Sequence, residues 1–204
     1  MNYEERRPMN RTIIYIILII VWLYLLSVLK RGKLGFFYFI FGAVGLFLLI
    51  ITNVELIMQP YIQGTTYVIG TIGKLLNIFD AFPSSGIFFV THPRGSMSLY
   101  LDLECSGIIE LSVFTSLILF FPLFSKTGRF LNALKGCLFI YLFNVARILL
   151  ILVTLKYCGM NLYPLAHSFV GRIVFYVLTI ILYFNIFTRS QIKKQKVGKF
   201  NYDN

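Results

Sequence analysis

The sequence predicts an all-α membrane protein with about five transmembrane helices, an extracytoplasmic interfacial segment and a short β-hairpin. The first observation is composition: 58% of the 204 residues are hydrophobic, 13% are charged, and the mean hydropathy is +0.79. The second is a set of apolar runs, each close to the roughly 20 residues that cross a bilayer as a helix. They cover residues 12–29, 36–58, 108–124, 138–155 and 169–187. A soluble domain could bury one such helix, but five in a chain of this length indicate a membrane protein.

The net charge of +11 is concentrated at the ends of the apolar runs. Three basic clusters alternate along the chain with acid-rich segments: Lys30, Arg31 and Lys33; Lys126, Arg129 and Lys135; and Arg189, Lys193, Lys194, Lys196 and Lys199. This is the positive-inside pattern of membrane proteins, and it argues against a nucleic-acid interface. It predicts that residues 59–104 lie outside the cytoplasm. It also places the N-terminus outside, where Arg6, Arg7 and Arg11 fit poorly, so the orientation of the first span stays open.

These observations divide the chain into four segments. Residues 1–58 hold two transmembrane helices, and the first is too long for a cleavable signal peptide and lacks a small-residue cleavage site. Residues 59–104 form the extracytoplasmic segment with the hairpin. Residues 105–187 form a three-helix membrane core that carries the candidate reactive residues, and residues 188–204 form a basic cytoplasmic tail.

The extracytoplasmic segment has two parts. Residues 61–79 are apolar, too weak for a sixth span and suited to the membrane interface, and three glycines weaken the expectation of a continuous helix. From residue 96 to 104 apolar and polar residues alternate with a period of two, which indicates a strand. A second apolar run, 87–91, is joined to it by His92-Pro93-Arg94-Gly95, which is typical of a turn. We therefore expect a hairpin whose second strand leads straight into Cys105.

The three cysteines are too few for a disulfide framework. Cys137 falls near the inner end of the fourth span. Cys105 and Cys158 both fall on the outer side, where a disulfide between them is chemically possible. That disulfide is the plain structural alternative for Cys105.

Cys105 is a candidate nucleophile because it stands where a polar stretch gives way to the third span, which is expected to begin near Ser106. A helix N-terminus carries about half a positive charge, which favours a thiolate. Glu104 and Glu110 act in the opposite direction, since nearby negative charge raises the pKa of a thiol. A cation is therefore expected close to Cys105. For both glutamates we favour complementation of the helix end over catalysis.

Arg147 is a candidate because it lies near the middle of the fourth span, where a charge costs about 2.5 to 3.5 kcal/mol. Asn144 and Thr154 are expected on the same face of that helix. The guanidinium must face a cavity or a partner. The alternatives are an arginine held by backbone carbonyls and one that extends alone toward the membrane surface.

His167 is expected in the first turn of the fifth span, because Pro164 suits the first position of a helix. A lone histidine at an interface is often a simple amphipathic cap. Its candidacy depends on Cys105 and Arg147, since the up-and-down topology points all three toward the outer leaflet. Arg172 is expected to extend toward the membrane surface or to contact lipid headgroups, and His92 in the hairpin turn is the rival base.

These motifs resemble the exosortase/archaeosortase family of membrane cysteine transpeptidases. The matching residues are Cys105-Ser106-Gly107 at the start of one span, Asn144-x-x-Arg147 inside the next, and His167-x-x-x-Gly171 opening the one after. Each motif alone is weak, but three in order on consecutive spans are fairly specific. The resemblance covers residues 61–187, and the two N-terminal spans are fewer than longer exosortases carry, which implies a small or divergent member.

The resemblance implies that Cys105, Arg147 and His167 are catalytic. It implies an extracytoplasmic site and a membrane-anchored protein substrate that ends in a recognition motif, a transmembrane helix and a basic tail. Cys105 would form a thioester, His167 would transfer protons, and Arg147 would stabilise the oxyanion or the thiolate. Asn144 would orient Arg147 or serve as a packing amide, and Gly171 would leave room for substrate or pack against another helix.

Two alternatives stay open from the residues themselves. A non-catalytic permease or assembly factor would use Arg147 and Asn144 as a polar pathway. An intramembrane protease would pass the thioester to water rather than to an amine. No metal or other cofactor is expected, because the two histidines lack ligand spacing and neither a CxxC pair nor a phosphate-binding glycine loop occurs.

Overall fold

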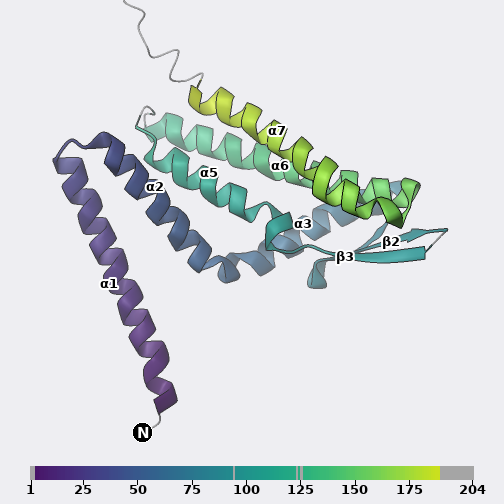
Figure 1. Cartoon of the computed structure of the whole chain (residues 1–204), viewed down its shortest axis with the longest axis horizontal. Helices are drawn as coiled ribbons and strands as arrows, with labels where there is room; N and C mark the ends of the chain where they lie inside the picture. Colours follow the sequence, from purple (N-terminus) through teal and green to yellow (C-terminus); the bar gives the residue numbers. More distant parts are fainter. Residues whose placement is uncertain (1–2, 94, 123, 125, 189–204) are drawn as a thin grey trace, which may run out of the picture.

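The computed structural model describes residues 3–93, 95–122, 124 and 126–188. The chain is mostly helical, with one small sheet (Figure 1). Its elements are α1 (Tyr3–Arg31), α2 (Gly35–Thr52), α3 (Val54–Leu76), β1 (Asp80–Phe82), η1 (Pro83–Ser85), β2 (Ile87–His92), β3 (Gly95–Tyr100), α4 (Leu103–Ser106), α5 (Ile108–Phe120), α6 (Lys126–Cys158), η2 (Met160–Leu162), η3 (Leu165–Gly171), α7 (Arg172–Tyr183) and η4 (Phe184–Thr188). Within these residues four helices are long and apolar enough to cross a membrane, and α5 is a shorter apolar helix. The predicted fold class is confirmed.

α1 and α2 pair through the one tryptophan of the chain. The indole Nε1 of Trp22 donates a hydrogen bond to the carbonyl of Phe41 at 2.9 Å. Gly45 leaves space for the indole, since a Cβ there would lie 2.0 Å from Nε1. Near the other end of the pair, the Tyr15 hydroxyl lies 3.1 Å from Thr52 Oγ1. Polar contacts thus fix how these two apolar helices meet.

The second predicted span, residues 36–58, ends earlier than expected. α2 stops at Thr52, and residues 54–58 begin α3. The Thr52 hydroxyl and the Asn53 amide donate to the carbonyls of Leu48 and Leu49, each at 2.8 Å. Such local bonds compete with the backbone ladder and favour a helix end, which hydropathy alone does not reveal.

α3 is continuous over 23 residues, although its glycines had weakened that expectation. Two of the glycines are contact points for the chain that follows. A Cβ at Gly70 would lie 2.6 Å from the Ala81 Cβ, and a Cβ at Gly73 would lie 2.3 Å from the Phe79 ring. These glycines therefore let the β1 segment lie directly against α3.

The sheet is antiparallel, in the order β1-β2-β3. Its β2–β3 hairpin is the predicted one and pairs Ile87 with Tyr100 and His92 with Gly95, whereas the three-residue β1 was not predicted. β3 also ends before the predicted residue 104, so the strand does not lead straight into Cys105 and α4 intervenes. Phe88 and Val90 of β2 are buried in a cluster that includes Leu152 and Leu155 of α6.

α6 is the central helix and is longer than the predicted span, because it begins at Lys126 and runs for 33 residues, about 50 Å. α5 and α7 both pack on it. A second buried cluster joins these three helices: Phe114, Ile118, Ile140, Phe175 and Leu182.

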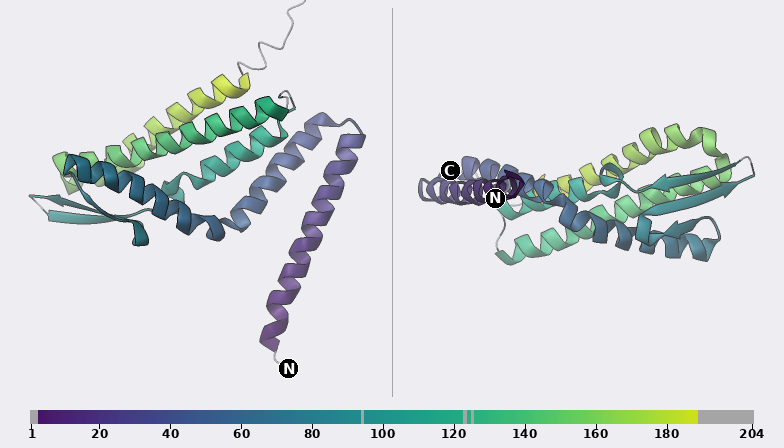
Figure 2. Two further views of the ribbon diagram at one scale, coloured as in Figure 1. Left: turned by 180° about the vertical axis from the view of Figure 1, so that it is seen from behind. Right: turned by 90° about the horizontal axis from the view of Figure 1, so that it is seen from below.

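The α1–α2 connection, the α5–α6 connection and the end of α7 gather at one end of the molecule, and the hairpin lies at the other (Figures 1 and 2). Two predicted basic clusters lie at this end, one where α1 ends and one in the first turns of α6. The third basic cluster, in the predicted tail 188–204, falls at 189–199, outside the described residues.

Candidate active site

Cys105 lies in α4, a single helical turn between the hairpin and α5. Asp102 is the N-cap of this turn, and its Oδ1 accepts a hydrogen bond of 2.8 Å from the backbone N–H of Cys105. Gly107, with φ of +82°, ends the turn in a left-handed conformation that suits glycine. The thiol is therefore presented from a separate turn, and not from the first turn of the third span as the sequence predicted.

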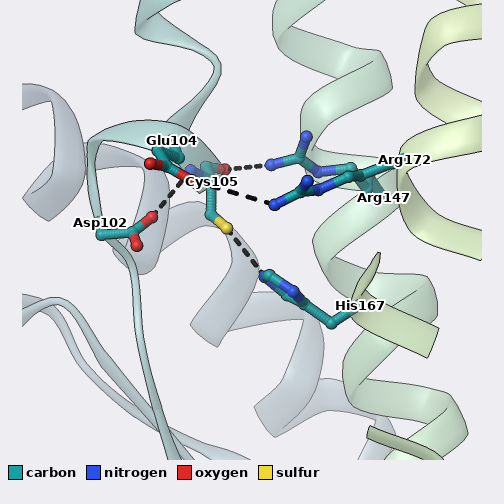
Figure 3. Close-up of polar contacts among 6 residues, drawn as sticks. All are labelled: Asp102, Glu104, Cys105, Arg147, His167 and Arg172. Carbon is teal, nitrogen blue, oxygen red and sulfur yellow. Dashed lines mark hydrogen bonds and ion pairs between the residues drawn. The ribbon is translucent and has the colours of Figure 1, made fainter. Parts of the chain in front are cut away.

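His167 faces the thiol, with Nε2 2.9 Å from the Sγ of Cys105 (Figure 3). It belongs to η3, a π-helical segment that leads directly into α7. Such segments are rare and frequently occur at functional sites. The imidazole stacks on the ring of Tyr163 with 5.2 Å between centroids, which fixes its plane. Two segments that are 62 residues apart in the chain thus bring a thiol and an imidazole into hydrogen-bond contact.

Arg147 reaches the same place from α6. Its Nη2 donates a 2.7 Å hydrogen bond to the backbone carbonyl of Cys105, and its guanidinium lies 5.0 Å above the ring of Phe175. The side chain is only 5% exposed. The contact matches the alternative of an arginine held by a backbone carbonyl. Because that carbonyl belongs to Cys105, the same contact also fixes the residue that carries the thiol.

Asn144, one turn earlier on α6, holds the next peptide of α4. It is fully buried, and its Nδ2 donates a short hydrogen bond to the carbonyl of Ser106. Gly107 packs against the same amide, since a Cβ there would lie 2.9 Å from the Asn144 Cγ. The Cys-Ser-Gly and Asn-x-x-Arg motifs therefore meet in space as one α4–α6 contact.

The environment favours a neutral thiol and a neutral imidazole. Burial, and after it the carboxylate of Asp102, raises the pKa of Cys105 to about 11, while Arg147 acts in the opposite direction. Burial, and after it the positive charges of Arg172 and Arg147, lowers the pKa of His167. The predicted thiolate at a helix N-terminus is thus not favoured, because α4 has only four residues and its N-terminal end carries a carboxylate. A thiol that donates to Nε2 requires the imidazole proton on Nδ1.

Two cavities flank the thiol–imidazole pair. The polar cavity, about 300 Å³, is lined by Glu104, Cys105, Ile109, Glu110, Arg147, His167, Arg172 and Tyr176. The apolar cavity, about 40 Å³, is lined by Phe88, Leu99, Tyr100, Leu101, Cys105, Ile148, Ile151, Leu152, Tyr163 and His167. The reactive pair is therefore accessible from a charged side and from an apolar side.

The polar cavity also holds an ion pair that the sequence did not predict. Arg172 Nη2 lies 3.9 Å from Oε2 of Glu104, and both residues line the cavity, while the contact of Arg172 with the membrane surface stays a prediction. Both side chains are substantially exposed, so this ion pair is loose. Glu110 lies in the first turn of α5, as expected for complementation of a helix end, but its Oε2 is shielded from solvent and has no hydrogen-bond partner in the described residues.

Several other candidates lie away from the reactive pair. Cys158 is exposed, and both it and Cys105 are free thiols, so the alternative disulfide is not formed. His92 packs near Gly159 and lines neither cavity. Thr154 donates to the carbonyl of Leu150 in its own helix at 2.8 Å. Gly171 is buried where η3 meets α7 and lines neither cavity, which favours the helix-packing interpretation.

Three residues of this site were missed from the sequence: Asp102, Tyr163 and Tyr176. Asp102 was assigned to the period-two strand. An aspartate directly before a helical turn is also an N-cap signal. Tyr163 lies just before η3 and Tyr176 lies in α7, and hydropathy does not distinguish either from an ordinary interfacial aromatic residue.

A family model described as transmembrane exosortase (Exosortase_EpsH) matches residues 6–184 of the chain. The chain matches no curated protein and no solved structure.

Proposed function

The chain belongs to the transmembrane exosortase family, and we propose that it is a cysteine transpeptidase of the membrane. In this proposal it cleaves exported proteins at a C-terminal sorting signal, made of a short motif, a transmembrane helix and a basic tail. The observation that carries the proposal is the 2.9 Å contact between Cys105 Sγ and His167 Nε2, beside a buried arginine.

Acylation begins from the neutral pair. As Sγ of Cys105 attacks the scissile carbonyl carbon, the thiol proton passes to Nε2 of His167. The tetrahedral intermediate collapses when the imidazolium gives that proton to the leaving amine and the C–N bond breaks. Cys105 is left as a thioester, and His167 is again neutral and ready to serve as a base. The raised pKa of Cys105 and the lowered pKa of His167 support this coupled transfer over a preformed ion pair.

Arg147 supplies the positive charge for these reaction steps. One guanidinium nitrogen holds the Cys105 carbonyl, and a guanidinium has five N–H donors in all, so others are available to an oxyanion in the polar cavity that Arg147 lines. A donor of this kind contributes about 3 kcal/mol in characterised oxyanion holes. Asn144 acts as a positioning residue through the Ser106 carbonyl.

The positive-inside pattern supports an extracytoplasmic site. The basic end of α1 and the basic start of α6 lie at the end of the molecule opposite the hairpin. We assign residues 105–187 as the catalytic core and residues 59–104 as the outer segment that delivers Cys105. Residues 1–58 supply the first two membrane helices.

The permease alternative has less support. A polar pathway needs Arg147 and Asn144 to be open to a solute, but both side chains are buried and both donate to backbone carbonyls of α4. Intramembrane proteolysis shares the thioester with transpeptidation and differs only in the acceptor.

The test is coexpression with a candidate substrate that has a C-terminal helix and a basic end. We expect wild-type protein to process it and Cys105→Ala to leave it intact. Cys158→Ala is the matched control, because Cys158 is an exposed free thiol that lines neither cavity. Processing by Cys105→Ala at the wild-type level would eliminate the nucleophile assignment.

A further inference from the structure

A further cavity lies at the end of α5 that is away from Cys105. This distal cavity, about 420 Å³, is lined by Phe39, Leu117, Phe121, Ile180, Tyr183, Phe184, Phe187 and Thr188. Ile180 and Phe184 are more than half exposed, although both belong to the apolar stretch Phe169–Thr188, which is long enough to cross a membrane. The distal cavity is therefore open sideways, at a depth where the bilayer surrounds the chain.

The distal cavity and the polar cavity beside Cys105 lie on matching faces of the same helices. Lining residues of α7 and η4 follow one another at intervals of three or four: Arg172, Tyr176, Ile180, Tyr183 and Phe187. On the α5 side, Glu110 lines the polar cavity, and Leu117 and Phe121 follow in the distal one at intervals of seven and four. Such intervals keep side chains on one face of a helix. The two cavities are therefore the ends of one groove between the helices, the α5–α7 seam.

The α5–α7 seam is packed at its floor and exposed along its walls. Phe114 of α5 is fully buried, and its ring lies 5.5 Å from the ring of Tyr183 and 5.9 Å from the ring of Phe187, centroid to centroid. Both helices run along α6, on which they pack (Figure 1). Tyr176, between the two cavities, is half exposed. A groove of this kind can receive another helix through side-chain packing, which drives helix association in lipid.

We infer that the α5–α7 seam is the docking site for the transmembrane helix of the protein substrate. This inference rests on the proposed function, because it names the surface that holds the substrate of that reaction. The seam begins at the polar cavity, which Cys105 and His167 line, so a helix that follows the scissile bond enters the seam directly. The apolar cavity on the other side of the reactive pair, which Leu99 of β3 lines, then takes the residues before the scissile bond.

The length of the seam favours a helix over a lipid chain as its occupant. The seam extends from Arg172 to Phe187, about 20 Å along the helix axis. One leaflet of the hydrocarbon core is about 15 Å thick, so a lipid chain that starts at the polar cavity does not reach the end of the seam. A transmembrane helix crosses both leaflets and covers all of it. A lipid of the opposite leaflet would fill the distal cavity alone, and the experiment separates that occupant from the helix.

The direct test is disulfide cross-linking in the full-length protein, coexpressed with the candidate substrate that has a C-terminal helix and a basic end. Changing all three cysteines to alanine removes every thiol of the chain, including the nucleophile, so the substrate stays uncleaved. Ile180→Cys is added to this background, single cysteines are placed in turn along the substrate helix, and copper phenanthroline is the oxidant. We expect cross-links at substrate positions that repeat every three or four residues, which is one face of the helix.

Ile181 provides the matched control. It is the next residue of α7 and is also exposed, but it lines neither the distal cavity nor the polar one. We therefore expect Ile181→Cys to give no cross-link with the substrate helix. In the protein with its own cysteines, Ile180→Trp fills the distal cavity and should lower substrate processing about tenfold, because the helix no longer fits the seam. Ile181→Trp should stay within about twofold of the wild-type rate.

Equal cross-linking at the two positions, or none at Ile180→Cys, would overturn the inference and leave the proposed function intact. Absent cross-links together with normal processing by Ile180→Trp would indicate a lipid in the distal cavity and would equally overturn it. Cleavage that survives Cys105→Ala would instead overturn the proposed function. If Ile180→Trp does not accumulate in the membrane, the cross-linking pair decides alone, because its substitutions add no bulk.

Discussion

The N-terminal pair α1–α2 and the bundle of α4 to α7 meet their neighbours in different ways. Only 6% of the apolar span of α1 is buried, against 44% of the span of α6. α1 and α2 meet through one indole hydrogen bond and a few polar contacts at their ends. In the bundle, two buried polar side chains of α6 hold consecutive carbonyls of α4. Both regions contain polar contacts, but those made by buried side chains of α6 fix the turn that carries the reactive thiol.

The largest expected effect comes from the buried contact of the bundle. We expect Arg147→Ala to reduce substrate processing at least about 100-fold, because it removes both the donor to the Cys105 carbonyl and a donor for the oxyanion. Arg172→Ala is the matched control, a cation at the same cavity that is 46% exposed and only loosely paired. Its loss should be less than about tenfold, in line with a solvent-screened pair. Processing rates in coexpressing cells measure both, and equal losses would contradict a special role for the buried arginine.

The next largest effect is the pH dependence of alkylation at Cys105, whose thiol should react slowly at neutral pH. Since burial and Asp102 raise the pKa of Cys105 to about 11, its thiolate fraction rises as pH increases toward that value. In a Cys137→Ala/Cys158→Ala background, we expect alkylation of Cys105 by iodoacetamide to accelerate about tenfold per pH unit between pH 7 and pH 10. The rate is read by mass spectrometry of the intact protein.

A control variant separates the two causes of that raised pKa. Asp102→Asn removes the carboxylate but keeps the burial, so alkylation at pH 8 should become faster than in the parent protein. A thiol that reacts at its full rate already at pH 7 would indicate a preformed thiolate and would contradict the neutral pair.

The bundle also shows what the sequence does and does not reveal. Arg147 was predictable because a charge inside an apolar run demands a partner, and Cys105 and His167 were predictable from their motifs and places at the ends of spans. The partners of Arg147 and Asn144 were not, because they are backbone carbonyls of α4, which leave no mark on residue type. The sequence indicates this contact only through Gly107, a glycine whose left-handed conformation ends α4.

The rest of the fold follows the same division. The hairpin was predicted from its period of two, whereas β1 has only three residues and shows no period. The end of α2 at Thr52 depends on the side chains of Thr52 and Asn53, which donate to carbonyls of α2 inside the span that the sequence extends to residue 58. Packing decides which side chains meet. It brings Arg172 to Glu104, and it buries Oε2 of Glu110 without a hydrogen-bond partner in the described residues.

Substitutions of two glycines, one in each region, have the smallest expected effects. Gly107 lies against Asn144 in the bundle, and Gly45 lies against Trp22 in the N-terminal pair. At Gly107 an added Cβ meets a buried, hydrogen-bonded amide, and φ of +82° strains any other residue. We expect Gly107→Ala to destabilise the protein by about 1 to 3 kcal/mol and to lower processing several-fold, because α4 must shift away from α6.

At Gly45 the added Cβ meets the edge of an indole that is only partly buried. We expect Gly45→Ala to displace Trp22 from the Phe41 carbonyl and to shift tryptophan fluorescence, which reports on this one indole alone. Processing should stay at the wild-type rate, since neither α1 nor α2 lines a cavity beside Cys105. If Gly45→Ala impairs processing as much as Gly107→Ala does, the N-terminal pair transmits its packing to the site, and the two regions do not differ in the way their contacts indicate.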